Sequence, residues 1–489
     1  MNILRRGRLQ VAPDEDIMRF TSSMEADKRI FDSDIEVDKA HVVMLKEQGI
    51  INEGDCSAIL SGLEKIQKEG ILALDTSSYE DVHIALEARL IEMVGEDTGG
   101  RMHSGRSRND EVATCIRLTL RMELLCLMEE ALDLVGMLIK IAGKHHETIM
   151  PGYTHTQHAQ PTTLSHNLLA HANAFLRDIE RIKVAFRHTN QNPLGAAAFA
   201  STGFPINRKR TTELLGFDSA IENSMDAVST RDFMIESISC FSNMMTNLGR
   251  IAEEMILWSS SEFGFIELDD SYSSTSSIMP QKKNPDIAEL MRAKVGTVHG
   301  SLMSVLTICK ALPYSYNRDM QEATPHLWRA VDTVRASVRM TRGMAGTMKV
   351  KKNSMIKATG SGFMTATELA DVIVQTTGIP FRTAHHIVGA IAKKGSAPTL
   401  SILDELSSEI IHEKLSDRGL TEKAVREALD PVDNVRKRKV MGGPSPLETK
   451  RQLAVIKKKI TIIEKDIGQL NKKINEASDK LTKACKKCI

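Results

Sequence analysis

The feature that most constrains the fold of this chain is the length of its uninterrupted helical stretches. Residues 110–144 contain no proline, and only two glycines interrupt them. Apolar residues recur there at the spacing of one helix face, for example at Ile116, Leu120 and Leu124. The same helical pattern is found in residues 161–188, 222–263 and 286–310. Pro161, at the start of the first of these ranges, suits the first turn of a helix. Helices of about 25 to 40 residues exceed the globular mean of about 11–12 and predict a bundle of long helices.

The composition agrees with an all-α fold and argues against several other classes. Aromatic residues make up only 4% of the chain while there are 25 methionines, and no convincing strand-like alternation is found. The formal net charge of +1 predicts no general attraction to nucleic acid or to a membrane surface. No segment approaches the roughly 18 apolar residues of a membrane span. Helices this long would leave apolar stripes exposed, which predicts an oligomer.

A chain of 489 residues is too long for one simple core, so several domains are expected. Changes in composition and in the length of the helical patterns indicate where these domains lie. Short helical patterns near the N-terminus cover residues 37–48 and 55–68, and shorter helices return at 366–377 and 381–394. The predicted segments are a mixed helical domain (1–109), a central long-helix bundle (110–360), a small C-terminal helical domain (361–460) and a lysine-rich helical tail (461–489). Residues 1–6 contain two arginines without an apolar run behind them, so no signal peptide is expected.

The tail carries a heptad pattern, because its apolar residues from Leu453 to Leu481 alternate three- and four-residue spacings with lysines between them. An amphipathic helix packed on its own subunit or on a neighbour is expected, and binding to an anionic surface is the alternative. Cys485 and Cys488 form one Cys-x-x-Cys pair, and a metal site would need two more ligands. Free thiols at a frayed end are therefore expected. The seven scattered cysteines predict no disulfide framework and a cytoplasmic location.

Polar segments that interrupt the long helices are the candidates for chemistry. They cover residues 99–110, 151–163, 271–286 and 313–322. Each mixes Gly or Pro with side chains that donate hydrogen bonds to carboxylates. The first contains Arg101, Arg106 and Arg108, whose guanidinium groups match the two oxygens of a carboxylate. A basic loop between subunits is the alternative interpretation of that segment.

The second and third segments suggest proton transfer and a mobile lid. His155 and His158 lie three residues apart, but no nearby acid or cysteine completes a zinc site, so an acid–base or a structural role is expected. A run of small hydroxyl residues around Ser276 precedes Lys282 and Lys283, which predicts a lid over an anionic substrate rather than a plain linker. A phosphate loop, a dinucleotide fingerprint and a hydrolase nucleophile elbow are all absent from the sequence.

Three of these segments resemble the signature regions of the fumarase/aspartase superfamily, which includes the δ-crystallins of eye lens. They are residues 103–110 (HSGRSRND), 152–155 (GYTH) and 276–285 (SSIMPQKKNP). The MPQKKNP wording, together with GRSRND, resembles the argininosuccinate lyase branch in particular. Further matches occur at 80–83, 202–206, 231–233 and 316–322, so that the resemblance runs in order from about residue 5 to residue 460.

The resemblance implies an all-α homotetramer in which each active site gathers segments from three subunits. It implies a β-elimination that cleaves a carbon–nitrogen bond of argininosuccinate and releases L-arginine and fumarate, as in arginine biosynthesis. No metal or organic cofactor is required for that reaction, and the implied partners are a small-molecule substrate and further copies of the chain. Alternatives are another fumarate-releasing lyase, acting on adenylosuccinate or aspartate, or a catalytically silent, crystallin-like structural relative.

The resemblance also implies roles for single residues. Ser276 matches the base that removes the proton, as an alkoxide next to Lys282, and His155 matches the general acid, oriented by Glu289. The residues that match the contacts of the succinyl carboxylates are Thr154, Ser107, Arg108, Asn109 and Asn284. The rest of the substrate-binding set, including the arginine end, is Ser23, Asp27, His83, Tyr316, Arg318 and Gln321.

The chain departs from the family pattern at a few positions. Thr275 stands where Gly is usual, and a β-branched residue there should stiffen the lid hinge. Residues 323–325 read ATP where an acidic residue and a Lys are common, which puts one arginine-side contact in doubt. Arg318 replaces a common Lys, and Glu111 and His158 stand where Gln and Arg are common. The tail beyond residue 461 has no counterpart in the family, and a role in tetramer stability or partner binding is a hypothesis for it.

Overall fold

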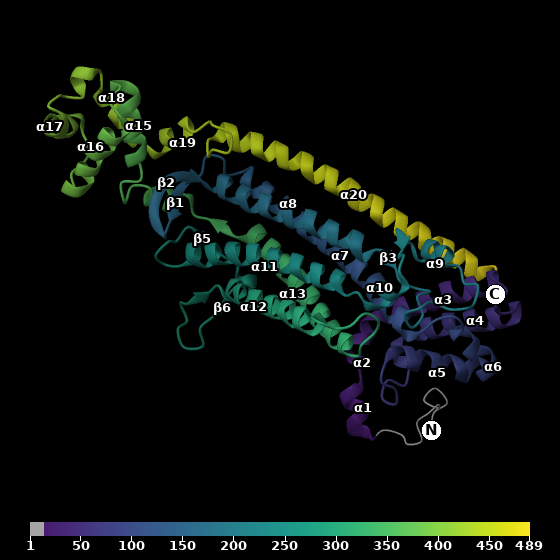
Figure 1. Cartoon of the computed structure of the whole chain (residues 1–489). Coiled ribbons are helices and arrows are strands. Elements are labelled where there is room, and N and C mark those ends of the chain that lie inside the picture. The colour runs from purple at the N-terminus through teal and green to yellow at the C-terminus, as the bar shows by residue number, and fades with distance from the viewer. Residues whose placement is uncertain (1–13) are drawn as a thin grey trace.

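The structure, a computed structural model, describes residues 14–489 and is built almost entirely from helices. Figure 1 shows long helices side by side in a bundle, with the N-terminal helices at one end and a small helical lobe at the other. The expected all-α class is therefore confirmed. Residues 1–6, considered above as a possible signal, lie outside the described residues. Over residues 14–489 no helix is both long and apolar enough to cross a membrane.

Short helices form the N-terminal end of the molecule. Their bounds are α1 (Glu15–Thr21), α2 (Met24–Asp27), α3 (Phe31–Glu47), α4 (Glu53–Glu69), α5 (Val82–Val94) and α6 (Glu96–Gly99). Local capping explains two of the starts, because the side chains of Asn52 and Asp81 accept hydrogen bonds from backbone N–H groups in the first turns of α4 and α5. The helices predicted over 37–48 and 55–68 are confirmed as parts of α3 and α4.

Five long helices form the bundle and bury its core. They are α7 (Arg108–Ala142), α8 (Leu164–Thr189), α11 (Asp232–Ser259), α12 (Asp286–Cys309) and α13 (Asp319–Thr347). Helix α7 packs on α8 and α13, and α11 packs on α8, α12 and α13. The helices predicted over 110–144 and 286–310 are confirmed. The single helix predicted over 222–263 is wrong, because Thr230 is extended and separates α10 (Ser224–Ser229) from α11.

Short strands, which the sequence did not reveal, connect the helices within residues 14–489. The four ladders pair β1 (Ile149–Thr154) with β2 (Gln157–Thr163), β3 (Gln191–Asn192) with β4 (Ser219–Ala220), β5 (Ile266–Glu267) with β8 (Lys349–Val350), and β6 (Ser274–Thr275) with β7 (Lys283–Asn284). Placing Pro161 in the first turn of a helix was wrong, since it lies opposite Pro151 in the β1–β2 hairpin and α8 begins at Leu164. Neither proline has an N–H to donate to the ladder, which tolerates such a pair at its edges.

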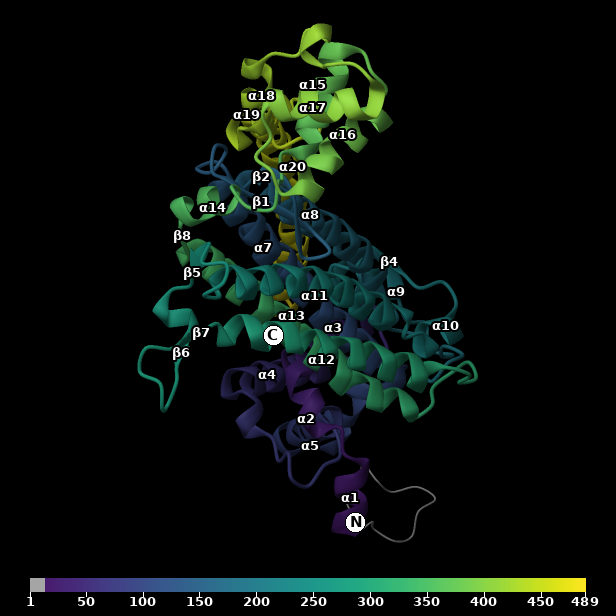
Figure 2. The same cartoon turned by 90° about the vertical axis from the view of Figure 1, so that its left-hand side faces the viewer.

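The C-terminal lobe has a hydrophobic core of its own. Its helices and those leading into and out of it are α14 (Lys352–Ala358), α15 (Ala366–Thr377), α16 (Phe381–Lys394), α17 (Leu400–Ile411), α18 (Glu422–Leu429) and α19 (Pro431–Lys437). Leu369, Ile373, Ile387 and Leu403 belong to this core, which is separate from that of the bundle. The helices predicted over 366–377 and 381–394 are confirmed. Figure 2 shows the lobe at the opposite end of the molecule from α1.

The last helix, α20 (Pro446–Lys486), runs from the C-terminal lobe back to the N-terminal helices along the outside of the bundle (Figure 1). It packs on α7, α8, α3 and the short helix α9 (Arg208–Leu215). The buried positions of its heptad pattern include Ile456, Ile463, Ile467, Ala477 and Leu481. Ion pairs of Lys183 with Asp466 and of Lys480 with Glu213 flank this contact. The expectation that the tail packs on its own subunit is confirmed.

The two terminal cysteines are free thiols, as expected, but the end of the chain is not frayed. Helix α20 continues to Lys486, and both Cys485 and Cys488 are buried. They lie by Cys56 of α4, whose pKa is raised to about 12 by burial and by the neighbouring Cys488. The tail therefore ends in an apolar contact with the N-terminal helices.

Deleting residues 461–489 should destabilise the protein, because it removes Ile463, Ile467 and Leu481 from the core and exposes the residues they cover. Each buried aliphatic side chain contributes about 1.5–3 kcal/mol. The midpoint of thermal unfolding should fall by at least about 5 °C, measured by calorimetry. The double variant Lys459→Ala, Lys472→Ala is the control, since both lysines are exposed. An unchanged midpoint in the truncated chain would show that the buried seam contributes nothing.

Candidate active site

A cavity of about 380 Å³ lies at the N-terminal end of the bundle and collects most of the predicted substrate-binding residues. Nine of the ten line it: Ser23, Asp27, His83, Ser107, Arg108, Asn109, Tyr316, Arg318 and Gln321. They come from four segments that are far apart in the sequence. Only Asn284 of that set lies elsewhere. The name "N-terminal pocket" is used for this cavity below.

The N-terminal pocket lies where three helices begin. Asp81 caps α5, Ser107 caps α7 through a capping box with Asp110, and Arg318 immediately precedes α13. The first turn of a helix has unpaired N–H groups and the positive end of the helix dipole. Three such ends around one cavity favour negatively charged groups, carboxylates among them.

Asp110 joins the start of α7 to a neighbouring loop. Its carboxylate accepts hydrogen bonds from the backbone N–H groups of Ser107 (3.0 Å), Gly195 (2.8 Å) and Ala197 (2.8 Å). Asp110 is fully buried, and burial raises its pKa to about 6 although the three donors oppose this. The side chain of Asn109 donates to the carbonyl of Ala198 (3.1 Å). The pocket wall is thus fixed by hydrogen bonds, of which those from Gly195 and Ala197 are buried.

The same pocket also contains negative charge. Ser23 donates a hydrogen bond to the carboxylate of Asp27, whose pKa burial raises to about 6 against the opposing charge of His83. Arg108 binds Asp81 (2.8 Å), and Arg318 binds Glu80 (3.2 Å) and the carbonyl of Thr21 (2.7 Å). A ligand that carries both carboxylates and a cationic group matches this mixture of charges.

Some pocket residues were missed by sequence reasoning. Glu80, Asp81, Arg231 and Thr324 line the cavity but had been assigned no role. Arg231 is buried and donates to the carbonyls of Val228 and Thr230, and no carboxylate is paired with it among the described residues. The available signal for Glu80, Asp81 and Arg231 was their place in the matched segments 80–83 and 231–233, and for Thr324 it was the departure from the family pattern at residues 323–325.

Thr154 and His155 lie at the tip of the β1–β2 hairpin and not in the N-terminal pocket. Thr154 pairs with Gln157, so His155 and Thr156 form a two-residue turn, with φ of 55° and 59°. Positive φ at both central residues is typical of a type I′ turn, which favours Asn and Gly. In a β-branched threonine this conformation is strained, by about 1–3 kcal/mol. The turn places His155 at an exposed position.

His158 has a structural environment. Its ring lies 5.1 Å from that of Tyr153, which in turn is 5.5 Å from Phe263. Its Nδ1 is 3.5 Å from the hydroxyl of Ser361. Of the two histidines considered for acid–base chemistry, His158 therefore packs against the linker to the C-terminal lobe, and His155 alone is presented at the tip.

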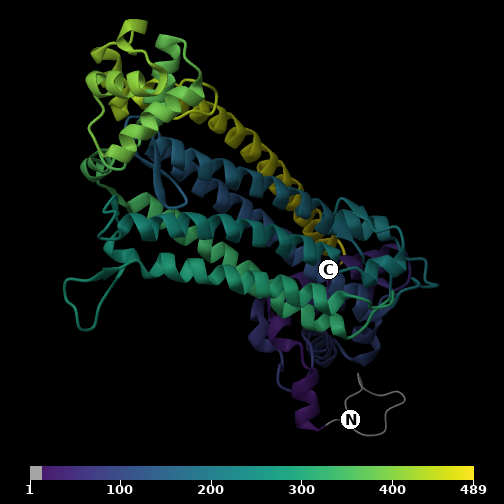
Figure 3. The ribbon, with the colours of Figure 1, turned by 60° about the vertical axis from the view of Figure 1, so that its left-hand side comes forward.

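Ser276, Lys282 and Asn284 lie on the β6–β7 loop, which projects from the bundle (Figure 3). Thr275 pairs with Lys283 at the base of the loop. The Oγ of Ser276 accepts hydrogen bonds from the backbone N–H groups of Ile278 (3.3 Å) and Met279 (3.0 Å). Two donors on one hydroxyl oxygen stabilise the negative charge of an alkoxide. Glu289 follows in the first turns of α12, as the sequence predicted.

The predicted site residues thus form three separate groups in one chain. The N-terminal pocket lies near α5, whereas the β1–β2 hairpin and the β6–β7 loop lie at the other end of the bundle (Figures 1 and 3). The structure brings nine predicted residues together and leaves six apart from them: Thr154, His155, Ser276, Lys282, Asn284 and Glu289.

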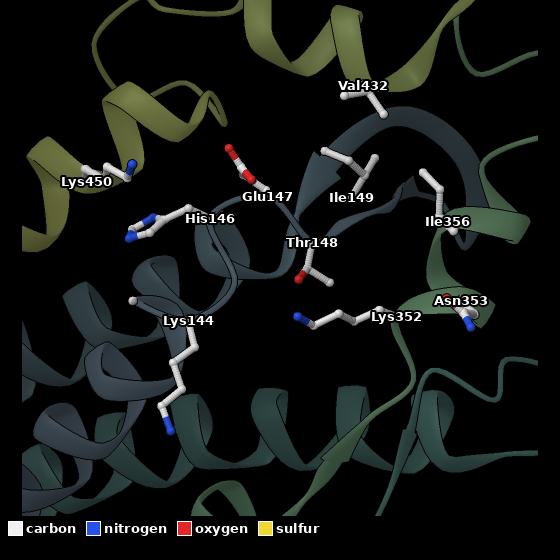
Figure 4. Close-up of a pocket in the computed structure, with 11 residues that line it drawn as sticks. Lys144, His146, Glu147, Thr148, Ile149, Lys352, Asn353, Ile356, Val432 and Lys450 are labelled. Atoms are coloured by element: carbon white, nitrogen blue, oxygen red, sulfur yellow. The ribbon is translucent and has the colours of Figure 1, made fainter.

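A larger cavity of about 660 Å³ lies at the base of the hairpin, away from all three groups. Lys144, Lys352, Lys450 and His146 line it, with Ile149 among its apolar residues. Figure 4 shows the ammonium groups of the three lysines apart from one another and pointing in different directions. They do not converge on one point, so the cavity lacks the arrangement that holds a compact anion.

Behind the N-terminal pocket, buried acidic groups lie close enough together to resemble a cation site. Ligand atoms of Asp34, Asp38 and Glu111 lie within 4.8 Å of one another, as do those of Asp34, His83 and Cys115. The guanidinium of Arg106 forms ion pairs with Asp38 and Glu111 (3.0 Å), and His83 pairs with Asp34 (2.8 Å). Side chains of the protein therefore supply the positive charge in this cluster.

Comparisons with known proteins agree with this geometry. The family model described as lyase matches residues 7–300, and the one described as argininosuccinate lyase C-terminal matches residues 363–436. An argininosuccinate lyase of Methanosarcina mazei is 65% identical over 93% of this chain and 92% of that protein. One of Methanocaldococcus jannaschii is 48% identical over 94% of each.

Solved structures give the same picture. EDDS lyase in complex with formate is 31% identical, with a TM-score of 0.88 over all of this chain and 98% of the other. A class II fumarase from Schistosoma mansoni is 16% identical, with a TM-score of 0.71 over 85% of this chain and 92% of the other. The fumarase supports the fold alone.

Replacing Asp110 by alanine should destabilise the fold, because the buried N–H groups of Gly195 and Ala197 lose their acceptor. Each buried donor left unsatisfied costs about 1–3 kcal/mol, so the urea midpoint of unfolding should fall clearly. Asp133→Ala is the control, since Asp133 is exposed on the same helix. Equal midpoints for the two variants would contradict a structural role for the Asp110 carboxylate.

Proposed function

This chain belongs to the argininosuccinate lyase family, and from that membership we propose how its own residues carry out the reaction. The chain is a carbon–nitrogen lyase that cleaves argininosuccinate into L-arginine and fumarate, a step of arginine biosynthesis. The observation that carries the assignment in the structure is the N-terminal pocket, whose mixed charge matches a substrate with three carboxylates and a guanidinium group. Relatives 48–65% identical over nearly the whole chain bear the same name.

We propose that Ser276 is the base. The proton to be removed lies on carbon next to a carboxylate and is weakly acidic, so its removal needs a strong base, and a serine alkoxide is one. The N–H groups of Ile278 and Met279 already donate to its Oγ, and Lys282 on the same loop adds positive charge. As the proton leaves, charge builds up on the neighbouring carboxylate, where prearranged donors stabilise it.

His155 is the general acid in this proposal. The departing guanidino nitrogen of arginine needs a proton, and an imidazole titrates near neutral pH. The turn presents His155 at the exposed tip of the hairpin. Glu289, in the first turns of α12, is the carboxylate that orients it.

The remaining residues bind the substrate. The succinyl carboxylates are held by Thr154, Ser107, Arg108, Asn109 and Asn284, of which three lie at the start of α7. The rest of the substrate is held by Ser23, Asp27, His83, Tyr316, Arg318 and Gln321. Within this set the carboxylate of Asp27 is the partner for a cationic group. The lining residue Thr324 stands where the family often has a lysine, so the chain binds the arginine end without that cation.

We propose that the active enzyme is a homotetramer with sites shared between subunits. The three groups lie apart in one chain, and a complete site therefore needs other copies. Helix α12 buries one stripe against the bundle and leaves Leu290 (57%), Met303 (64%) and Leu306 (42%) exposed. Large apolar side chains exposed along one helix favour association with another copy. The implied partners are the substrate and these copies, with neither nucleic acid nor membrane involved.

The cellular location and the domain limits are part of the same proposal. The seven cysteines are free thiols, which suits the reducing cytoplasm. The separate core of the C-terminal lobe, whose residues lie between Phe363 and Leu429, supports a small C-terminal domain within the proposed 361–460. The other proposed segments are 1–109, 110–360 and the tail of 461–489, which continues the helix α20 that begins at Pro446 and packs on the bundle.

Ultraviolet absorbance of fumarate tests the reaction. The purified protein should release fumarate from argininosuccinate but not from adenylosuccinate or aspartate. Ser276→Ala should lower kcat about 10³-fold, since general-base catalysis contributes about 10²–10⁴. Ser271→Ala, at an exposed position near the same loop, should keep kcat within about twofold. Near-normal turnover by Ser276→Ala would assign the base to another residue.

Mixing inactive variants tests the shared site. Ser276→Ala and His83→Asn affect different groups, so hybrid tetramers should contain some sites with neither substitution. After the two proteins are denatured together and refolded, fumarate release should exceed that of either variant alone. The control is the same mixture made without denaturation. Failure to regain activity, when refolded wild type does regain it, would place each complete site within one chain.

A further inference from the structure

A buried network of charges lies directly behind the N-terminal pocket. Nδ1 of His83 is 2.8 Å from the carboxylate of Asp34, on α3. His83 is 4% exposed and Asp34 is not exposed at all. Asp34 was absent from the predicted site because it belongs to none of the matched motifs. The pair is therefore a tertiary contact between α3 and α5 that only the structure reveals.

The second ring nitrogen of His83, Nε2, is buried and unpartnered among the described residues. His83 itself lines the N-terminal pocket. Asp34 occupies Nδ1, so that nitrogen carries a hydrogen and the ring orientation is fixed. A buried polar atom without a partner, on a residue that lines a pocket, calls for an explanation, and a bound ligand supplies one.

The surrounding charges favour the protonated ring. Burial lowers the pKa of His83, but the charge and hydrogen bond of Asp34 and the charges of Glu111 and Asp81 outweigh it and raise that pKa to about 10. The charged and titratable groups around His83 come from every neighbouring element: Asp27, Asp34, Asp38, Asp81, His103, Arg106, Glu111 and Cys115. Of these, Asp34 has the largest influence that favours the imidazolium.

Arg106 accounts for the other two buried carboxylates. It forms ion pairs with Asp38 and Glu111. Burial and the nearby charge of Asp34 raise the pKa of Asp38 to about 6 and that of Glu111 well above its ordinary value. One guanidinium, that of Arg106, thus lies between these two acids. Asp34 is the carboxylate that pairs with His83.

We propose that Asp34 is a positioning residue for the reaction, which holds His83 as an imidazolium whose Nε2–H donates a hydrogen bond to a carboxylate of the substrate. The inference rests on the proposed function and adds a residue and a charge state to it. The bond is charge-assisted on both sides, which makes it about twice as strong as a neutral one. The substrate carboxylate thus binds the imidazolium of His83, whose negative partner, Asp34, lies behind the pocket wall.

The pH dependence of KM for Asp34→Asn tests the proposal. Asparagine can still hydrogen-bond Nδ1 but removes the charge, so burial returns His83 to its neutral form. Relative to wild type, KM should rise by about 10-fold at pH 8.5 and by clearly less at pH 6, where more of the ring is protonated. Asp32→Asn, an exposed position on the same helix, should match wild type at both pH values. The same KM ratio at pH 6 and pH 8.5 would make Asp34 merely structural and overturn the proposal.

Calorimetry of fumarate binding gives a second readout that does not depend on turnover. At pH 8 in two buffers of different ionisation enthalpy, wild type should take up no proton, and Asp34→Asn should take up a fraction of one as His83 becomes charged. If Asp34→Asn does not fold, His83→Gln takes its place, and the proton uptake of wild type alone is decisive. Uptake by wild type at pH 8 that is absent in His83→Gln would show a neutral His83 and overturn the proposal. Failure of wild type to release fumarate from argininosuccinate would instead overturn the proposed function.

Discussion

The length of α7 determines where the parts of the active site can lie. Its 35 residues span about 50 Å, and the chain returns along it in α8, α11, α12 and α13. The length of this helix thus separates the residues at its start from those in the hairpin that follows its end. No small substrate bridges that distance within one chain. This separation is what the proposed association of several copies would overcome, and the large apolar side chains exposed on α12 are consistent with it.

At the N-terminal end of the molecule, the first turns of three helices determine the positions of the pocket residues. Ser107 and Asp110 fix the first turn of α7, Asp81 fixes that of α5, and the three N-terminal ends surround the same cavity. Burying Asp34, Asp38, Glu111, Arg106 and His83 together is costly unless they pair. The pairing found here leaves Nε2 of His83, a residue that lines the pocket, without a partner among the described residues. The buried charges thereby determine the charge next to the pocket, and burying them lowers the stability of the fold.

The sequence predicted the parts of this structure that depend on local signals. Long proline-free stretches predicted α7 and α12. Turn-forming residues marked the segments that contain the candidate catalytic residues. Pro161 was misplaced because hairpin residues 149–163 are mostly polar and lack the alternation of a half-buried strand. The break at Thr230 is set by Arg231, which turns inward to bond nearby carbonyls. Such contacts form only in the folded protein, and no spacing in the sequence announces them.

The same distinction separates the site residues. Ser107, Arg108 and Asn109 were found because they are consecutive in one motif, and their assembly with Tyr316 follows from two helices beginning at one place. Asp34 belongs to no motif, and the spacing of residues does not mark it. In the sequence, an acidic residue at a buried position of α3 only interrupts the apolar pattern of that helix. A buried ionisable residue at a core position is nevertheless informative, because its cost must be offset by a partner. For Asp34 that partner is His83, and through it the core of the N-terminal helices is connected to the chemistry of the pocket.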